Sequence, residues 1–212
     1  MLNELIRFEE YKALNPCELT PQQLVSLEKE IKDHKSDKTS DEYADFLLWA
    51  NGLPLRQERF AEYIAKRLKD KPNAKILEVG CGRLGRLSKM LAKKGFLMTG
   101  IDPKLEVSGT DSIQFYKQKF DYKTAVLDDY DYVIGQEPCD ATEHIIRACL
   151  KQNKPFIISL CGTPHKLLSG KTPKTAYDWF DCLVDLAPDR LVLRLAKFDP
   201  FFVTPILRSK KF

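Results

Sequence analysis

The pattern of apolar and polar residues changes near residue 70. Before that point, apolar residues recur every three or four positions, as they do on one face of a helix. After it, short apolar runs alternate with helical patterns, which is typical of a parallel sheet covered by helices. The sequence therefore predicts a helical N-terminal extension, residues 1–54, followed by an α/β domain, residues 55–212.

The predicted helices of the first 70 residues have recognisable ends. The second begins at Thr20-Pro21, a favoured pair for a cap and a first turn, and the third ends at Gly52 and Pro54. Residues 34–40 are polar and predict a loop. The four predicted helices cover residues 3–14, 21–33, 41–51 and 55–69.

Strands and helices alternate from Lys75 onward. Strands are predicted at residues 75–79, 96–101, 113–120, 132–134 and 155–160, with helices at 86–94, 140–151 and 177–186. Two further strands, residues 190–198 and 201–208, are predicted to form a terminal antiparallel pair around a turn at Asp199-Pro200. These elements predict a doubly wound, mostly parallel sheet with seven strands.

The stretch ILEVGCGRLGRL, residues 76–87, links the first predicted strand to its helix. Gly80, Gly82 and Gly85 have the spacing G-x-G-x-x-G, in which glycines let the backbone approach a ligand beside a helix N-terminus. That spacing also occurs in nicotinamide and flavin dinucleotide sites. Glu78 distinguishes this chain, because a dinucleotide-binding strand normally has a small apolar residue there.

The residues E-V-G-C-G, from Glu78 to Gly82, resemble motif I of class I methyltransferases that use S-adenosylmethionine. The resemblance implies that Glu78 lies near the methionine part of this cofactor. It also implies that the loop containing Gly80, Cys81, Gly82 and Gly85 passes beside the sugar and methionine moieties.

A second match to that family is TGIDP, residues 99–103, where Asp102 closes the second strand, 20 residues after Gly82. The resemblance implies that the Asp102 carboxylate accepts from the two ribose hydroxyls. A weaker match implies that Asp121 contacts the adenine amino group, although a solvated turn residue is the alternative. The chain departs from the family pattern at Leu84, where glycine is more usual.

The resemblance also bears on the two ends of the chain. In class I methyltransferases the last strand inserts beside its predecessor and runs against the rest of the sheet, which fits the terminal strand pair. Helices that precede the fold often cover the cofactor or shape the acceptor site. The N-terminal extension is therefore expected to be either a lid or a helical cap that buries one face of the sheet.

Acceptor chemistry is expected where the fourth and fifth strands end, because ligands in open α/β sheets bind beyond the carboxyl ends of strands. Gln136 and Glu137 follow the fourth strand, and His165 follows the fifth. Gln136 is a candidate for cofactor or acceptor contact, and Glu137 and His165 are the catalytic candidates. Glu137 would act as a base or orient the acceptor, with a capping or solvated role as the alternative.

The six cysteines contain no C-x-x-C pair or repeated spacing, so neither a zinc finger nor a disulfide framework is predicted. Cys81, Cys139 and Cys161 each follow a predicted strand, with His144 and His165 not far along the chain. A zinc or nucleophile site is one interpretation of these residues. No metal is assigned, because the spacings match no signature and buried cysteines are common.

The distribution of charge along the chain does not identify a partner. The net charge of +4 combines an acidic first segment, with 6 Lys or Arg against 11 Asp or Glu in residues 1–50, with a basic remainder. Ordinary surface charge explains this difference in charge between the two segments, with an anionic substrate or nucleic acid as the alternative.

The chain has no apolar run of membrane-spanning length and no apparent leader, so a cytoplasmic protein is expected. Its oligomeric state is left open.

Together these observations predict an S-adenosylmethionine-dependent methyltransferase that transfers a methyl group by in-line displacement. The acceptor is unknown, and a small molecule or RNA is expected. One alternative is an NAD(P)-dependent oxidoreductase, which the glycine spacing and Asp102 permit. Another is a regulatory protein that binds S-adenosylmethionine without catalysis.

Overall fold

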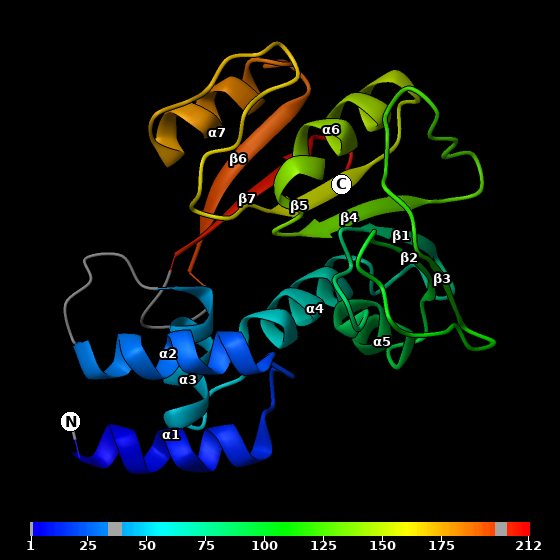
Figure 1. The fold of residues 1–212 in the computed structure, drawn as a ribbon. Helices are drawn as coiled ribbons and strands as arrows, with labels where there is room; N and C mark the ends of the chain where they lie inside the picture. The colour runs from blue at the N-terminus through cyan, green and yellow to red at the C-terminus, as the bar shows by residue number, and fades with distance from the viewer. Residues whose placement is uncertain (1, 34–39, 198–202) are drawn as a thin grey trace. The chain divides into compact units, whose positions relative to one another are not determined.

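The computed structural model describes residues 2–33, 40–197 and 203–212 (Figure 1). The chain divides into two compact units, Met1–Arg59 and Phe60–Phe212. The expected boundary at residues 54/55, and the independence of the two parts as domains, stay predictions. The expected turn at Asp199-Pro200 and most of the 34–40 loop lie outside the described residues.

No helix in the described part of the chain has both the length and the apolar character needed to cross a membrane.

The first unit is helical, as its periodicity predicts. Its helices are α1 (Leu2–Leu14), α2 (Pro21–Asp33), α3 (Asp41–Ala50) and the beginning of α4 (Arg56–Arg67). The aromatic ring of Phe46 is fully buried and lies edge-on to Phe8 and Tyr11, with ring centroids 6.1 and 5.4 Å away. Leu27 and Ile31 complete this cluster from α2. Aromatic edge-to-face packing therefore joins α1 to α3 while α2 supplies aliphatic bulk.

The second unit is built on one seven-stranded sheet of order β3-β2-β1-β4-β5-β7-β6. Strands β1 to β5 pair in parallel, and β7 lies between β5 and β6 and is antiparallel to both. The predicted doubly wound sheet and its inserted antiparallel last strand are confirmed. The strands are β1 (Lys75–Val79), β2 (Leu97–Ile101), β3 (Ile113–Tyr116), β4 (Tyr132–Gln136), β5 (Phe156–Ser159), β6 (Leu191–Ala196) and β7 (Thr204–Ser209).

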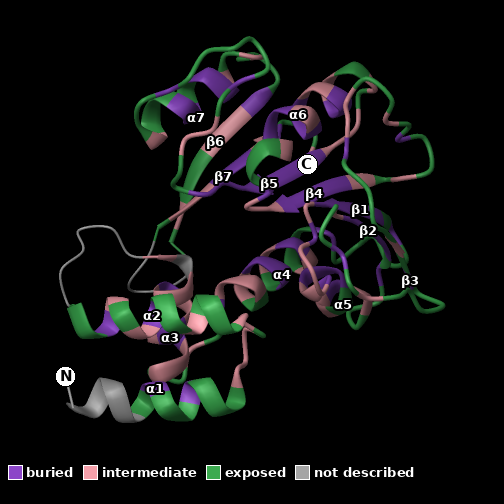
Figure 2. Cartoon of the chain, viewed as in Figure 1, coloured by how far each residue is buried: buried purple, intermediate pink, exposed green. Residues whose placement is uncertain are grey.

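Helices cover both faces of this sheet, and its central strands are largely buried (Figures 1 and 2). Alternate residues of one strand serve opposite faces, so Ile76 packs with α4 and α5 (Arg86–Ala92). Leu77 and Val79 belong to the cluster that contains the apolar sides of α6 and α7. Helix α6 spans Thr142–Lys151 after a short 3₁₀ turn, Cys139–Ala141, and α7 spans Ala176–Val184.

Among the strand ends that differ from the prediction, those of β3 and β4 differ for the same physical reason. Strand β3 ends at Tyr116 instead of residue 120, because Tyr116 pairs with Ile101, the last residue of β2, and no partner remains beyond it. Strand β4 continues through Gln136 instead of ending at Ile134, because β5 provides Ser159 as a partner for Gln136. Neighbouring strands, which periodicity does not show, determine where pairing stops.

We expect Phe46→Ala to lower the free energy of unfolding by about 3–5 kcal/mol, because it opens a cavity where three helices meet. The change should be followed by urea unfolding with tryptophan fluorescence, since Trp49 lies in the same unit, 5.2 Å from the Tyr11 ring. Val25→Ala, at a side chain of α2 that is 67% exposed, is the control and should change little. Equal unfolding midpoints for Phe46→Ala and the unaltered chain would contradict the assigned core.

Candidate functional site

The parallel strands bring several polar loops to one edge of the sheet. The loop after β1 begins at Gly80, Asp102 follows β2, and Glu137 follows β4. Strand β1 lies between β2 and β4, so these loops are neighbours. A Cβ placed on Gly80 would lie 3.0 Å from the Cα of Pro138, which means that the loops after β1 and β4 are already in close contact. The edge is the one where the sequence predicts a ligand.

Asp102 ties the glycine loop to the end of β2. Its Oδ2 accepts a hydrogen bond from the backbone N–H of Gly82 at 3.0 Å, and its Oδ1 accepts from the N–H of Lys104 at 2.7 Å. Arg83 pairs with Glu106 at 2.8 Å and strengthens the same junction. Each carboxylate oxygen has a further lone pair, so Asp102 can still accept from hydroxyl groups of a ligand.

Two glycines of the loop, Gly82 and Gly85, have different roles. Gly82 has a φ of +71°, and no atom lies within 4 Å of the place a Cβ would occupy. Gly85 has a φ of +58°, and a Cβ there would lie 2.3 Å from the Phe115 ring. Gly85 therefore allows the helix to approach the sheet, whereas Gly82 leaves open space beside Asp102.

Glu78 is a buried carboxyl group, only 2% exposed, under the glycine loop. The Ser88 hydroxyl, from α5, donates to its Oε2 at 2.5 Å. Burial raises the pKa of Glu78 to about 7, although the hydrogen bond from Ser88 opposes the shift. Ser88 was missed by sequence reasoning, because an isolated serine on the buried side of a predicted helix carries no motif.

Cys81 is also buried, and its side chain lies close to Gly100 of β2. Burial raises the pKa of the Cys81 thiol, and the thiol donates to the Gly82 carbonyl at 3.7 Å. The backbone N–H of Cys81 donates to the Ile101 carbonyl. These contacts make Cys81 a structural part of the loop, and its contact with a cofactor stays a prediction.

Gln136 and Glu137 lie at the end of β4, as predicted. The side-chain oxygen Oε1 of Gln136 is buried and has no hydrogen-bond partner among the described residues. An unpaired buried carbonyl is costly, and the contact of Gln136 with a cofactor or an acceptor stays a prediction. Glu137 has a φ of +50°, and its N–H donates to the Ser159 carbonyl at 2.8 Å. This unusual backbone turns the chain sharply at the sheet edge.

Asp121 lies in the loop after β3, beyond the strand's end. It lines a pocket of about 350 Å³ whose apolar wall includes Leu77, Ile101 and Phe120. The N–H of Lys123 donates to the Asp121 carboxylate and lowers its pKa below the ordinary value, and His144 lies 3.4 Å away. The pocket thus combines an apolar wall with one carboxylate.

The structure brings together three residues of the cysteine and histidine set and separates the others. Side-chain atoms of Cys139, Cys161 and His165 lie within 4.8 Å of one another. Cys81, within the glycine loop, lies close to Gly100, and His144 lies beside Asp121. His165, one of the two catalytic candidates, therefore lies in a cluster with Cys139 and Cys161.

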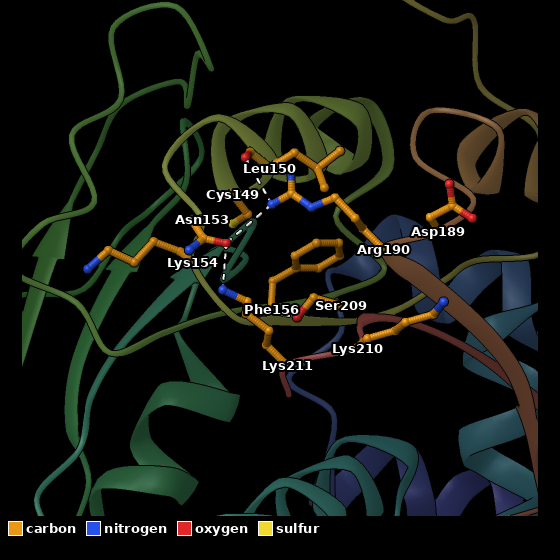
Figure 3. Close-up of a pocket in the computed structure, with 10 residues that line it drawn as sticks. All are labelled: Cys149, Leu150, Asn153, Lys154, Phe156, Asp189, Arg190, Ser209, Lys210 and Lys211. Atoms are coloured by element: carbon orange, nitrogen blue, oxygen red, sulfur yellow. Dashed lines mark hydrogen bonds between the residues drawn. The ribbon is translucent and has the colours of Figure 1, made fainter.

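A second pocket, of about 200 Å³, lies at the opposite edge of the sheet, beside the beginning of β5 (Figure 3). Three of its cations make hydrogen bonds within the chain: Lys154 donates to the carbonyls of Asp128 and Tyr130, Arg190 to the carbonyl of Leu150, and Lys211 to the side-chain oxygen of Asn153. These bonds hold neighbouring loops together, and none of the site residues predicted from the sequence lines this pocket.

The chain matches no protein-family model and no curated protein. Among solved structures, it is similar to a proposed methyltransferase of an antibiotic biosynthesis pathway from Anabaena variabilis, at 14% identity and a TM-score of 0.44. That match covers 65% of this chain and 64%, less than two thirds, of the Anabaena protein.

Two further similar structures are also methyltransferases. A SAM-dependent methyltransferase from Leishmania major has 14% identity, a TM-score of 0.46 and 72% coverage of both chains. The 1,6-didemethyltoxoflavin-N1-methyltransferase of Burkholderia thailandensis, bound to 1,6-didemethyltoxoflavin and S-adenosylhomocysteine, has 15% identity and a TM-score of 0.49, over 82% of this chain and 92% of that chain. The strand order of this chain, with an antiparallel β7 between β5 and β6, is that of a doubly wound, Rossmann-like fold.

We expect the stability of the protein to fall as pH rises through the range set by Glu78. The carboxyl group releases its proton near 4.5 in the unfolded chain and near 7 in the folded one. The folded chain holds more protons between these values, so the free energy of unfolding falls by about 3 kcal/mol across them. Glu78→Gln should remove this fall.

Urea unfolding at a series of pH values measures that effect. Glu62→Gln removes the same charge at a side chain that is 70% exposed and paired with Lys94, and it should leave the pH dependence unchanged. A Glu78→Gln protein that loses stability over this range as steeply as the unaltered chain would show that Glu78 is not the responsible group.

Alanine substitutions should separate the two roles of glycine. Gly82→Ala adds only backbone strain and should lower the free energy of unfolding by about 1 kcal/mol. Gly85→Ala also drives a methyl group into the Phe115 ring, and should lower it by about 2–5 kcal/mol. Phe115→Leu should reduce the additional loss at Gly85, and equal losses at the two glycines would contradict the packing role.

Proposed function

We propose that this protein is a methyltransferase that binds S-adenosylmethionine at the carboxyl edge of β1, β2 and β4. The observation that carries the proposal is the position of the Asp102 carboxylate beside the open space at Gly82. Two carboxylate oxygens suit two adjacent hydroxyl donors, as in a ribose. The motif resemblance at Glu78–Gly82 and the inserted antiparallel β7 support the same assignment.

The residues present fit this cofactor in three further respects. The left-handed Gly82 keeps side-chain atoms out of the space that a nucleoside would take. Oε1 of Gln136, which has no partner within the described ranges, offers an acceptor for a ligand donor such as an ammonium group. The buried Glu78 would place a carboxyl group beneath the methionine part, with Gly80, Cys81 and Gly85 shaping the loop around it.

The pocket at Asp121 is proposed to take the adenine ring. A flat heteroaromatic ring suits the apolar surfaces of Leu77, Ile101 and Phe120. The carboxylate of Asp121 can accept from an exocyclic amino group at the pocket's rim. This assignment makes Asp121 a binding residue that distinguishes adenine from rings without an amino group.

The chemistry divides between cofactor and protein. When bound, S-adenosylmethionine supplies an electrophilic methyl group. The protein's own residues must bind the acceptor in line with that group, exclude water and remove a proton where the acceptor requires it. Glu137 is the proposed base or orienting group, because it follows β4 directly and its backbone is held by Ser159.

His165 is the second proposed acceptor-side residue, in the loop after β5. Its Nδ1 is 3.0 Å from Asp140 Oδ1, so the ring is oriented, and its side chain is 20% exposed.

The proposed acceptor is a small molecule. The N-terminal helices are proposed to act as a lid or a cap, and a cytoplasmic location is likewise a proposal.

Calorimetric titration with S-adenosylmethionine, S-adenosylhomocysteine, NAD and NADP tests the proposal. We expect the two adenosyl ligands to bind saturably and the dinucleotides not to bind. Asp102→Asn should weaken adenosyl-ligand binding by about 10- to 100-fold, because a charged acceptor for the hydroxyl groups is lost.

Asp131→Asn is the matched control, because Asp131 also accepts a backbone N–H, that of Lys75, at the opposite edge of the sheet. It should bind like the unaltered chain. Binding of NAD or NADP in place of the adenosyl ligands would identify an oxidoreductase. Binding without methyl transfer to any acceptor in a broad small-molecule screen would favour the regulatory alternative.

A further inference from the structure

Two thiols and an imidazole converge beyond the ends of β4 and β5. Cys139 follows β4, Cys161 follows β5, and His165 lies four residues further along the same loop. The two sulfur atoms and a ring nitrogen lie within 4.8 Å of one another, and Cys161 Sγ is 3.4 Å from His165 Nε2. No residue of this cluster is needed by the proposed cofactor site.

The backbone is bent to bring Cys139 to this position. Glu137 and Cys139 both have left-handed backbones, with φ of +50° and +49°. Such conformations cost about 1–3 kcal/mol each in residues other than glycine, and persist where the surrounding structure imposes them. Strain of this kind is concentrated at functional sites. The hydrogen bond from the Glu137 N–H to Ser159 holds this turn against β5, which leads into Cys161.

The imidazole of His165 is oriented from its far side. Asp140 Oδ1 lies 3.0 Å from Nδ1, and the ring packs beside buried Trp179 at a centroid distance of 5.2 Å. A carboxylate on Nδ1 places the proton there and leaves the lone pair of Nε2 toward Cys161. The same arrangement orients histidine ligands in metal sites.

We propose that Cys139, Cys161 and His165 bind one zinc ion, with Asp140 positioning His165 and a water in the fourth coordination position. Zinc takes thiolate and imidazole ligands at about 2.3 and 2.0–2.1 Å in tetrahedral geometry, which puts sulfur and nitrogen about 3.5 Å apart. The 3.4 Å between Cys161 Sγ and His165 Nε2 agrees with that spacing.

The donor set selects the metal and defines the chemistry. Two thiolates with one imidazole are soft ligands that suit zinc and exclude magnesium and calcium, which require oxygen. On binding, each thiol releases its proton to solvent. Three protein ligands leave one position open, as in zinc sites that bind a further ligand. His165 would then be a metal ligand, and the acceptor-side proton transfer would fall to Glu137 alone.

Metal analysis of the full-length protein, purified with a reductant and without chelator, tests the site directly. We expect one zinc per chain. After removal of zinc, titration with Co²⁺ should produce a thiolate-to-cobalt charge-transfer band and the intense visible bands of tetrahedral cobalt, and Zn²⁺ should displace both. This readout is independent of S-adenosylmethionine binding, so its failure leaves the proposed methyltransferase intact.

Variants assign the ligands. Cys139→Ser and Cys161→Ser should each abolish tight binding, whereas Asp140→Asn should keep the thiolate band and weaken affinity by about 10- to 100-fold. Cys17→Ser, in the other unit of the chain, is the matched control and should bind zinc normally. Cys139 is exposed, so its substitution leaves the apolar core intact, and circular dichroism verifies folding.

Three results would overturn the proposal. One is the absence of a thiolate band in the reduced, unaltered protein. Another is unchanged Co²⁺ affinity in both Cys139→Ser and Cys161→Ser. The third is a stable disulfide between Cys139 and Cys161 in protein purified without a reductant, detected by mass spectrometry after free thiols are blocked, because it would make the pair a redox element and not a metal site.

Discussion

The parallel pairing of β1 with both β2 and β4 is the constraint on which the candidate site depends. Because the three strands run in the same direction, the loops that leave them emerge at one edge. Residues far apart in the chain, such as Gly82 and Asp102, are thereby brought into hydrogen-bond contact. Small apolar neighbours make this possible, since the close approach of Gly80 and Pro138 leaves no room for a larger side chain.

The site places polar groups where the fold alone would not favour them. Glu78 is buried in the sheet, and its raised pKa means that it can be neutral near physiological pH. The side-chain oxygen of Gln136 has no hydrogen-bond partner in the described part of the chain, and Glu137 and Cys139 have left-handed backbones. Each of these features lowers stability and none improves core packing. Their concentration at the carboxyl edge of one sheet is the pattern expected when a protein is shaped for ligands.

The amino edge of the sheet, where β5 begins, differs from the carboxyl edge in how its charged side chains are bonded. There Lys154 donates to the carbonyls of Asp128 and Tyr130, and Arg190 donates to the carbonyl of Leu150 (Figure 3). These two side chains are bonded to the backbone and so help to stabilise the fold. At the carboxyl edge, the open space at Gly82 and the pocket beside Asp121 remain available.

The sequence by itself determined the helical first unit, the alternating order of strands and helices, and the places of Glu78, the glycines and Asp102, because periodicity and short motifs are local properties. Only the tertiary structure decided where β3 and β4 end, since backbone pairing depends on neighbouring strands. It also revealed the Ser88 hydrogen bond to Glu78 and the meeting of Cys139, Cys161 and His165. Those contacts join different elements across the sheet, and their spacing along the chain carries no recognisable signal.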